Sequence, residues 1–180
     1  MREDEFMKTV ADYIKTIPDF PKPGILFRDV TSVLDDAEGF KLAIDELDKL
    51  LDGVDYDIIA GVESRGFLFG APLAYNNDKP FALVRKKGKL PRETVEESYS
   101  LEYGTATIEL HKDAIKPGDK VIIIDDLIAT GGTVEAAAKL VERLGGEVVK
   151  MIFLIELTDL KGREYLKNYD VASVVQYVGE

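Results

Sequence analysis

The chain lacks cysteine and tryptophan altogether and contains a single histidine, His111. The absence of cysteine excludes disulfide bonds, thiol catalysis and thiolate-bound zinc or iron–sulfur centres. With one histidine, a metal site built from several histidines is excluded, and a serine–histidine–aspartate triad would have to use His111. The residues around His111 indicate no such role, so we expect it at the surface or in packing. The lack of cysteine also favours a cytoplasmic location.

Positive charge is scarce. The 23 lysine and arginine residues stand against 34 aspartate and glutamate residues, which gives a formal net charge of −11. Nucleic acids and anionic lipids bind basic surfaces, so neither is expected as a partner. A small anionic ligand stays compatible, because it needs only a local positive pocket. Long hydrophobic runs are missing too, whereas a membrane helix needs about 20 apolar residues. The acidic N-terminus is unlike a secretion signal.

The length of 180 residues and a hydrophobic fraction of 46% predict a single domain over residues 1–180. Apolar residues at helical spacing predict helices over residues 6–17, 40–51, 65–74 and 134–144. Short apolar runs predict strands over residues 57–61, 80–85, 105–110, 121–124, 148–157 and 171–177. The alternation of strands and helices predicts an α/β fold with a mainly parallel, open sheet flanked by helices.

Two segments fit neither pattern. Residues 20–24 contain two prolines and a glycine, which predicts a rigid loop. Residues 86–104 are polar and show little periodicity, so we expect an irregular excursion or a hairpin there. Long segments of this kind often form functional lids.

The most informative segment covers residues 121–133. Its apolar run ends in Asp125 and Asp126, a loop of small residues follows, and then a helix begins. In open α/β sheets, ligands bind beyond the carboxyl ends of the strands. Free N–H groups at a helix start attract anions, and Gly131 and Gly132 allow close approach to the backbone. The two carboxylates instead suit sugar hydroxyls, so the segment predicts a site for a phosphorylated sugar.

This segment resembles the signature of the type I phosphoribosyltransferases, which use 5-phosphoribosyl-1-pyrophosphate (PRPP) with magnesium. The resemblance implies that Asp125 and Asp126 hold the ribose hydroxyls. It also implies that a phosphate loop wraps the 5′-phosphate, and this loop consists of Ala129, Thr130, Gly131, Gly132 and Thr133. Mg²⁺ is then expected as a cofactor bound mainly through PRPP, without a protein metal site. A helix cap beside a solvated acidic pair is the alternative explanation.

The segment over residues 20–29 resembles the adenine-recognition loop of the adenine phosphoribosyltransferases. An aromatic ring on a stiff loop suits a flat base, since one stack is worth about 1–3 kcal/mol. The resemblance implies that Phe27 stacks on adenine while backbone groups of its two neighbours read the edge of the base. The alternative is that this segment plugs the core. A later segment, residues 154–164, resembles the family as well and is expected to help wall the base pocket. The adenine-binding residues expected from the resemblance are Leu26, Phe27, Arg28 and Leu127.

The resemblance extends to a pyrophosphate site. Arg65 follows a glycine-containing turn, where a guanidinium can hold phosphate through two hydrogen bonds, although a structural salt bridge is the alternative. Four of the 23 cations lie within residues 85–89. In this family, the arginine that matches Arg85 often comes from the partner subunit, so a homodimer is expected. The expected pyrophosphate ligands are Arg65, Arg85, Lys86 and Lys89.

Residues 101–104 resemble the lid of the same family, and residues 86–104 with the N-terminal segment are expected to form a hood and lid over the base. Within the lid, Glu102 and Tyr103 are the expected catalytic residues, with Glu102 as general base. The implied reaction converts adenine and PRPP to AMP and pyrophosphate in purine salvage. Two other classes stay open. One is a PRPP-sensing regulator, although the roughly 20 residues before the loop are too few and too acidic for a DNA-binding segment. The other is a phosphoribosyltransferase for xanthine or a pyrimidine.

Overall fold

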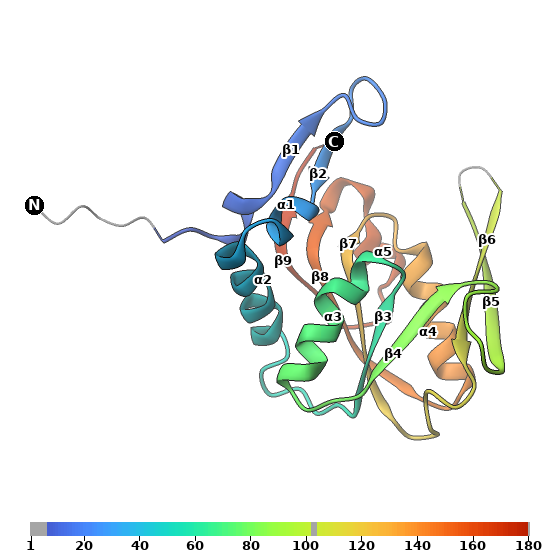
Figure 1. The fold of residues 1–180 in the computed structure, drawn as a ribbon. Helices are drawn as coiled ribbons and strands as arrows, with labels where there is room; N and C mark the ends of the chain where they lie inside the picture. The colour runs from blue at the N-terminus through green and yellow to red at the C-terminus, as the bar shows by residue number, and fades with distance from the viewer. Residues whose placement is uncertain (1–6, 102–103, 180) are drawn as a thin grey trace, which may run out of the picture.

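Seven strands form the main sheet of the computed structural model, which describes residues 7–101 and 104–179. Their spatial order is β5-β6-β4-β3-β7-β8-β9 (Figure 1). The five strands from β4 to β9 in this order run parallel, while β5 and β6 are antiparallel to their neighbours. The predicted α/β fold with a mainly parallel sheet is thereby confirmed. The strands are β3 (Ile58–Val62), β4 (Phe81–Lys86), β5 (Thr94–Ser100), β6 (Thr105–His111), β7 (Lys120–Ile128), β8 (Glu147–Leu157) and β9 (Val171–Tyr177).

Helices cover both faces of this sheet. Along β7, Val121 and Ile123 pack on one face with α4, while Ile122 and Ile124 pack on the other face with α2 and α3. All four side chains are fully buried, and each such burial is worth about 1.5–3 kcal/mol. Strand β7 is therefore held from both sides, which fixes the position of the chain at its carboxyl end. The predicted helices correspond to α2 (Ala37–Lys49), α3 (Arg65–Asn76) and α4 (Gly132–Arg143).

Strand β7 is longer than predicted. The apolar run predicts a strand that ends at Ile124, before the two carboxylates. In the structure, β7 continues to Ile128, because Leu127 and Ile128 pair with Ile155 and Glu156 of β8. The carboxylates therefore belong to a strand held by its neighbour.

The N-terminal segment corrects a second prediction. Instead of a helix over residues 6–17, the described residues form the short 3-10 helix η1 (Val10–Tyr13) and the strand β1 (Lys15–Pro18). Strand β1 pairs antiparallel with β2 (Leu26–Asp29), and this pairing overrides the helical spacing. Residues 20–24 connect the two strands as the predicted loop. We call residues 15–29 the hood; Figure 1 shows it projecting beyond the main sheet.

Strands β5 and β6 pair as a hairpin at one edge of the main sheet. The expectation of a hairpin is confirmed, and that of irregular structure is wrong for residues 94–100. Every second side chain of β5 points inward, and these residues are Val95, Glu97 and Tyr99. Glu97 interrupts the expected apolar pattern, and it pairs with Arg143 of α4. The remaining short elements are α1 (Thr31–Leu34), η2 (Thr158–Leu160) and α5 (Gly162–Tyr165). Among the described residues, no helix is long and apolar enough to cross a membrane.

Candidate active site

A cavity of about 330 Å³ opens at the carboxyl ends of β3 and β7, and we call it the main cavity. This is the edge of the sheet where the sequence placed a sugar-phosphate site. Its lining is almost entirely polar or charged. The lining residues are Glu63, Ser64, Arg65, Lys86, Tyr99, Asp125, Asp126 and Thr133. The main cavity thus unites residues assigned separately to ribose, phosphate and pyrophosphate, and adds three residues that sequence reasoning missed.

The two carboxylates at the end of β7 differ in their surroundings. Asp126 is buried, and its Oδ2 lies 2.6 Å from Nε of Arg65. Asp125 accepts a hydrogen bond from the backbone N–H of Asp126 at 2.8 Å. Burial raises the pKa of Asp125 well above its ordinary value, and the adjacent charge of Asp126 raises it further, against the opposing effect of Arg65. Asp125 therefore binds a proton more readily than an ordinary aspartate does.

Arg65 begins α3 beside these carboxylates. Its ion pair with Asp126 matches the structural alternative, yet the Arg65 side chain is 48% exposed and also lines the main cavity. Glycine is required at the next position, because a Cβ on Gly66 would lie 2.9 Å from the carbonyl oxygen of Ile124. The close approach of α3 to β7 places the guanidinium against the carboxylates. Arg65 is thus available to a ligand that displaces Asp126.

The phosphate loop, residues 129–133, lines a smaller cavity of about 100 Å³ together with Asp125 and Leu127. Gly131 has a φ of +91°, a left-handed conformation that suits glycine, and stands at the N-cap of α4. The N–H groups of the first helical turn have no partner within the helix, so they can receive an anion. A Cβ on Gly162 would lie 2.5 Å from the carbonyl oxygen of Ala129. The start of α5 therefore supports the loop from behind.

Strand β8 holds α5 in place through one buried charge. Glu156 is buried, and its two carboxylate oxygens accept hydrogen bonds from Nε and Nη2 of Arg163 at 2.7 and 2.8 Å. Ser173 of β9 also donates to Glu156. Residues 154–164 are expected from the resemblance to help wall the base pocket. Within them, Gly162 lies against Ala129 of the phosphate loop, a supporting role that the sequence did not indicate.

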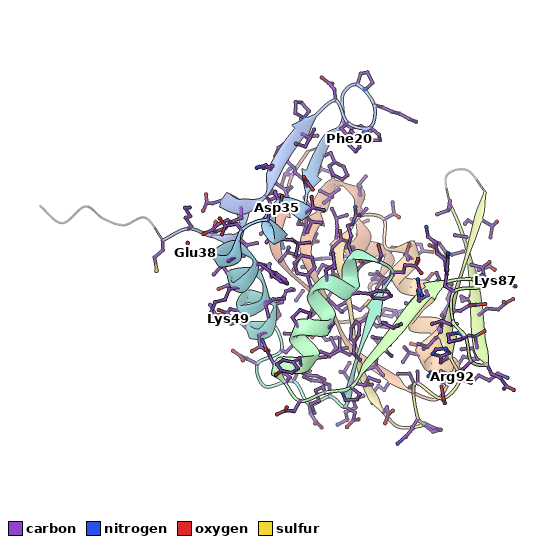
Figure 2. The ribbon with its side chains drawn as sticks, in the orientation of Figure 1. Phe20, Asp35, Glu38, Lys49, Lys87 and Arg92 are labelled. Carbon is purple, nitrogen blue, oxygen red and sulfur yellow. The ribbon has the colours of Figure 1, made fainter. Side chains whose placement is uncertain are left out.

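Of the four basic residues at the end of β4 and just beyond it, Arg85 and Lys87 form ion pairs. Nε of Arg85 lies 3.2 Å from Glu63, and Arg85 also donates to the carbonyl oxygen of Lys89. Lys87, labelled in Figure 2, pairs with Glu96 of β5 at 2.7 Å. Lys86 lines the main cavity. Of the predicted pyrophosphate ligands, Arg65 and Lys86 reach the main cavity, whereas Arg85 and Lys89 are not among its described lining residues.

The hood is anchored at the carboxyl end of β9. The guanidinium carbon of Arg28 lies 4.1 Å from the ring centroid of Tyr177, a cation–π arrangement. The rings of Phe20 and Phe27 meet edge to face with centroids 5.1 Å apart, and Figure 2 shows Phe20 near the outer end of the hood. Leu26 is 39% exposed, so it does not plug the core. Phe27 is half-buried.

Two other predictions have different outcomes. Glu102 and Tyr103, the expected catalytic residues, lie outside the described residues. His111 is buried, and its Nε2 accepts a hydrogen bond from the backbone N–H of Arg92 at 3.3 Å. The packing role expected for His111 agrees with this position.

Comparisons with known proteins fit this geometry. A family model described as "Phosphoribosyl transferase domain" matches residues 31–178. The chain is 73% identical over 174 residues to adenine phosphoribosyltransferase from Butyrivibrio fibrisolvens, covering 97% of this chain and 96% of that protein.

Two solved structures are similar throughout. Adenine phosphoribosyltransferase from Thermoanaerobacter pseudethanolicus is 55% identical with a TM-score of 0.90, covering 93% of this chain and 98% of that one. The enzyme from Saccharomyces cerevisiae, solved with adenine and an imino-altritol bisphosphate, is 41% identical with a TM-score of 0.86, covering 92% and 96%. The chain therefore belongs to the phosphoribosyl transferase family and, within it, to the adenine phosphoribosyltransferases.

Proposed function

We propose that the chain transfers the phosphoribosyl group of PRPP to adenine in the main cavity, forming AMP and pyrophosphate. The observation that carries this proposal is the meeting of three groups at one end of β7. Paired carboxylates, a glycine-rich helix start and two cations line adjoining cavities. Sugar hydroxyls, a phosphate and a pyrophosphate are the ligands that suit these three groups. The solved yeast relative holds adenine and a bisphosphate sugar mimic, which supports the same ligand chemistry here.

In this proposal, each end of PRPP has its own partners. The 5′-phosphate binds the N–H groups of the phosphate loop, where the helix dipole favours negative charge. The ribose hydroxyls donate to Asp125 and Asp126. The pyrophosphate lies near Arg65 and Lys86, with Arg85 held nearby by Glu63. This arrangement fixes the reacting carbon between the two anionic ends of the substrate.

Magnesium fits the oxygen-rich lining, but mainly through the substrate. The described residues contain no cluster of three or more carboxylate, histidine or cysteine side chains that could hold a metal. Asp125 and Asp126 would act through the ribose hydroxyls of a magnesium–PRPP complex. When bound, Mg²⁺ supplies charge neutralisation for the leaving pyrophosphate. We accordingly propose a cofactor that enters with PRPP.

The protein supplies charge on both sides of the bond that breaks. Positive charge develops on the ribose as pyrophosphate leaves, and the carboxylate of Asp126 lies on the ribose side. Arg65 and Lys86 stabilise the negative charge on the leaving group. Arg65 must exchange its contact with Asp126 for one with pyrophosphate, so substrate binding redistributes an ion pair that already exists.

We propose that residues of the hood bind the adenine base. Phe27 would stack on adenine, backbone groups of Leu26 and Arg28 would read its edge, and Leu127 would border it. Hydrogen bonds to the exocyclic amine would reject hypoxanthine, which has an oxygen there. We place Glu102 as the general base for the imidazole proton, with Tyr103 beside it. Glu102→Ala is then expected to lower turnover about 100- to 10,000-fold with little change in PRPP affinity; equal losses in both would count against this role.

We further propose a homodimer through the exposed side of α3 and β4. Leu68 and Tyr75 lie on one face of α3 and are 43% and 85% exposed, and Leu83 of β4 is 36% exposed. Arg85 follows Leu83 on the same face of β4, so a partner docked there would lie close to it. Leu83→Asp is expected to give a monomer in sedimentation analysis. Leu26→Asp changes an equally exposed leucine on the hood and should leave the dimer intact.

The reaction is tested with radiolabelled adenine, guanine, hypoxanthine and xanthine, each incubated with PRPP and Mg²⁺. We expect nucleotide formation from adenine and at most trace formation from the other bases. Comparable rates with xanthine or hypoxanthine would refute the specificity. The single domain over residues 1–180, with a hood and a lid, and the cytoplasmic location stay predictions.

A further inference from the structure

The hydroxyl of Thr133 contacts the β5–β6 hairpin. Thr133 Oγ1 donates a hydrogen bond to Oη of Tyr99 at 3.2 Å. The ring of Tyr99 lies beside the phosphate loop, since a Cβ on Gly132 would be 3.9 Å from its Cδ2. Tyr99 also lines the main cavity. A tyrosine that the sequence did not single out therefore joins the hairpin to the proposed phosphate site.

Contacts along α4 hold Tyr99 in this position. Arg143, at the other end of α4, donates to the carbonyl oxygen of Glu96 and pairs with the carboxylate of Glu97. Val95 and Tyr99 pack against the core on the α4 side of the sheet. The Tyr99 hydroxyl is therefore positioned by the hairpin as a whole, rather than by its one contact with Thr133.

The direction of this hydrogen bond has a chemical consequence. A hydroxyl carries one proton and can accept two hydrogen bonds. While Thr133 donates to Tyr99, the Thr133 proton is not available to a phosphate. A phenol is more acidic than an aliphatic alcohol, with an ordinary pKa of about 10, so it is the better donor of the two. Once an anion accepts a hydrogen bond from the Thr133 hydroxyl, the favoured arrangement has Tyr99 donating to Thr133.

We propose that Tyr99 is a positioning residue for ligands that carry a 5′-phosphate. Its hydroxyl turns the Thr133 hydroxyl toward the phosphate and polarises it through a two-member chain of hydrogen bonds. This inference rests on the proposed placement of the 5′-phosphate on the phosphate loop. It makes a distinction among ligands: PRPP and AMP carry that phosphate, whereas pyrophosphate and adenine do not.

The test compares the wild type with Tyr99→Phe, which removes only the hydroxyl. We expect calorimetry to show AMP binding about two- to tenfold weaker, the range that one net hydrogen bond supplies, with pyrophosphate binding unchanged. In steady-state kinetics, the KM for PRPP should rise by a similar factor, while the KM for adenine stays the same. A merely structural role would weaken both AMP and pyrophosphate.

Tyr169→Phe is the matched control. Tyr169 donates to Glu142 near the carboxyl end of α4 at 2.9 Å, far along the helix from the phosphate loop. Removal of the Tyr169 hydroxyl should leave AMP and PRPP binding unchanged. Thr133→Val should weaken AMP binding by itself, and adding Tyr99→Phe to Thr133→Val should cause no further loss.

The outcomes separate two failures. If Thr133→Val leaves AMP binding unchanged, the 5′-phosphate is not where we place it, and the role of Tyr99 is overturned with that placement. If Thr133→Val weakens AMP binding but Tyr99→Phe does not, only the role of Tyr99 is overturned. Additive losses in the double variant would also contradict it, because they would mean that Tyr99 does not act through Thr133.

Discussion

The phosphate loop and the hood flank the same edge of the main sheet but are supported very differently. The loop follows a strand whose core residues are fully buried and leads into a helix with six buried residues. Gly162 lies directly behind it. In the hood, by contrast, every residue of β1 is exposed, as is the first residue of β2.

The reaction needs charged groups that are already in place and also a region that can open for the base, and the two regions differ in this way. Charged groups stabilise a transition state best when they are already in place, which a rigid support provides. A region with few buried contacts opens at a lower free energy than the core does. We infer that the sugar-phosphate end of the site is preorganised, whereas the hood can adjust as the base enters and AMP leaves.

The largest effect is expected from Arg163→Met, which leaves the carboxylate of Glu156 buried without its main partner. Removing one member of a buried pair costs several kcal/mol. Because the Arg163 side chain is 42% exposed, we expect about 3 kcal/mol less free energy of unfolding, measured by denaturant titration. Arg92→Met breaks an exposed pair with Asp113 and should cost about 0–1 kcal/mol. Equal losses would mean that burial of Glu156 is unimportant.

The same pair predicts a dependence on pH. Burial acts to raise the pKa of Glu156, but hydrogen bonds from Arg163 and Ser173 and the charge of Arg163 outweigh it, so the pKa lies below its ordinary value of 4.5. A carboxyl group whose pKa is lowered in the folded state stabilises the protein at pH values above its ordinary pKa. That stabilisation is lost as the pH falls through the folded-state pKa. The difference in melting temperature between the wild type and Arg163→Met should become smaller over that pH range. A difference that stays constant would contradict a role for the ionised Glu156 carboxylate.

Gly162→Ala should displace the phosphate loop. The added Cβ would meet the backbone oxygen of Ala129, which cannot rotate away, and overpacking of this kind costs about 1–3 kcal/mol. We expect a loss of PRPP affinity of about tenfold or more in calorimetry, a change that 1.4 kcal/mol produces. Gly146→Ala is also crowded, because its Cβ would lie 2.7 Å from the Ile115 side chain, but this position lies beyond the far end of α4. It should lower stability without changing PRPP affinity.

Phe27→Ala should act on the base alone. Losing one stack at the lower end of its usual value, about 1 kcal/mol, raises the KM for adenine roughly fivefold. Since Phe27 belongs to the weakly supported hood, the melting temperature should change little. Phe20→Ala removes the neighbouring ring and should have a smaller effect on adenine. A large loss of stability in Phe27→Ala would contradict the view that the hood is less firmly supported than the phosphate loop.

The smallest effect concerns the proton on Asp125. Its pKa is raised in the free protein by burial and by Asp126, while a carboxylate that accepts from ribose hydroxyls is best ionised. PRPP binding should therefore release a proton and strengthen as the pH rises toward the raised pKa. Calorimetry in buffers of different ionisation enthalpy measures this release. Asp125→Asn provides the baseline for protons from PRPP itself, and an identical release in both proteins would contradict the prediction.

The sequence predicted the sheet and the ligand edge because the signals are local. Four apolar residues without polar alternation marked β7 as buried on both faces. Paired carboxylates followed by glycines marked its end. The spacing of the N-terminal apolar residues also fitted a helix, but Ile17 pairs instead with Phe27 across the hood. No local signal distinguishes these outcomes, since the decisive pairing lies in the fold.

The parts that sequence reasoning missed depend on distant partners. Glu97 hid the alternation of β5 because its partner, Arg143, lies in a helix much later in the chain. Tyr99 and Thr133 are 34 positions apart. Gly162 contacts Ala129 although α4 and β8 separate the two residues in the sequence. The sequence therefore indicated the groups that we propose to bind PRPP, but not the residues that hold those groups in place.

A crystal structure of the protein with AMP bound tests the placement of the reaction most directly. We expect the 5′-phosphate within hydrogen-bond distance of the backbone N–H groups of residues 130–133. The ribose hydroxyls should lie on Asp125 and Asp126, with the base beside Phe27. AMP bound away from the end of β7, or bound with its phosphate under the hood, would contradict this placement.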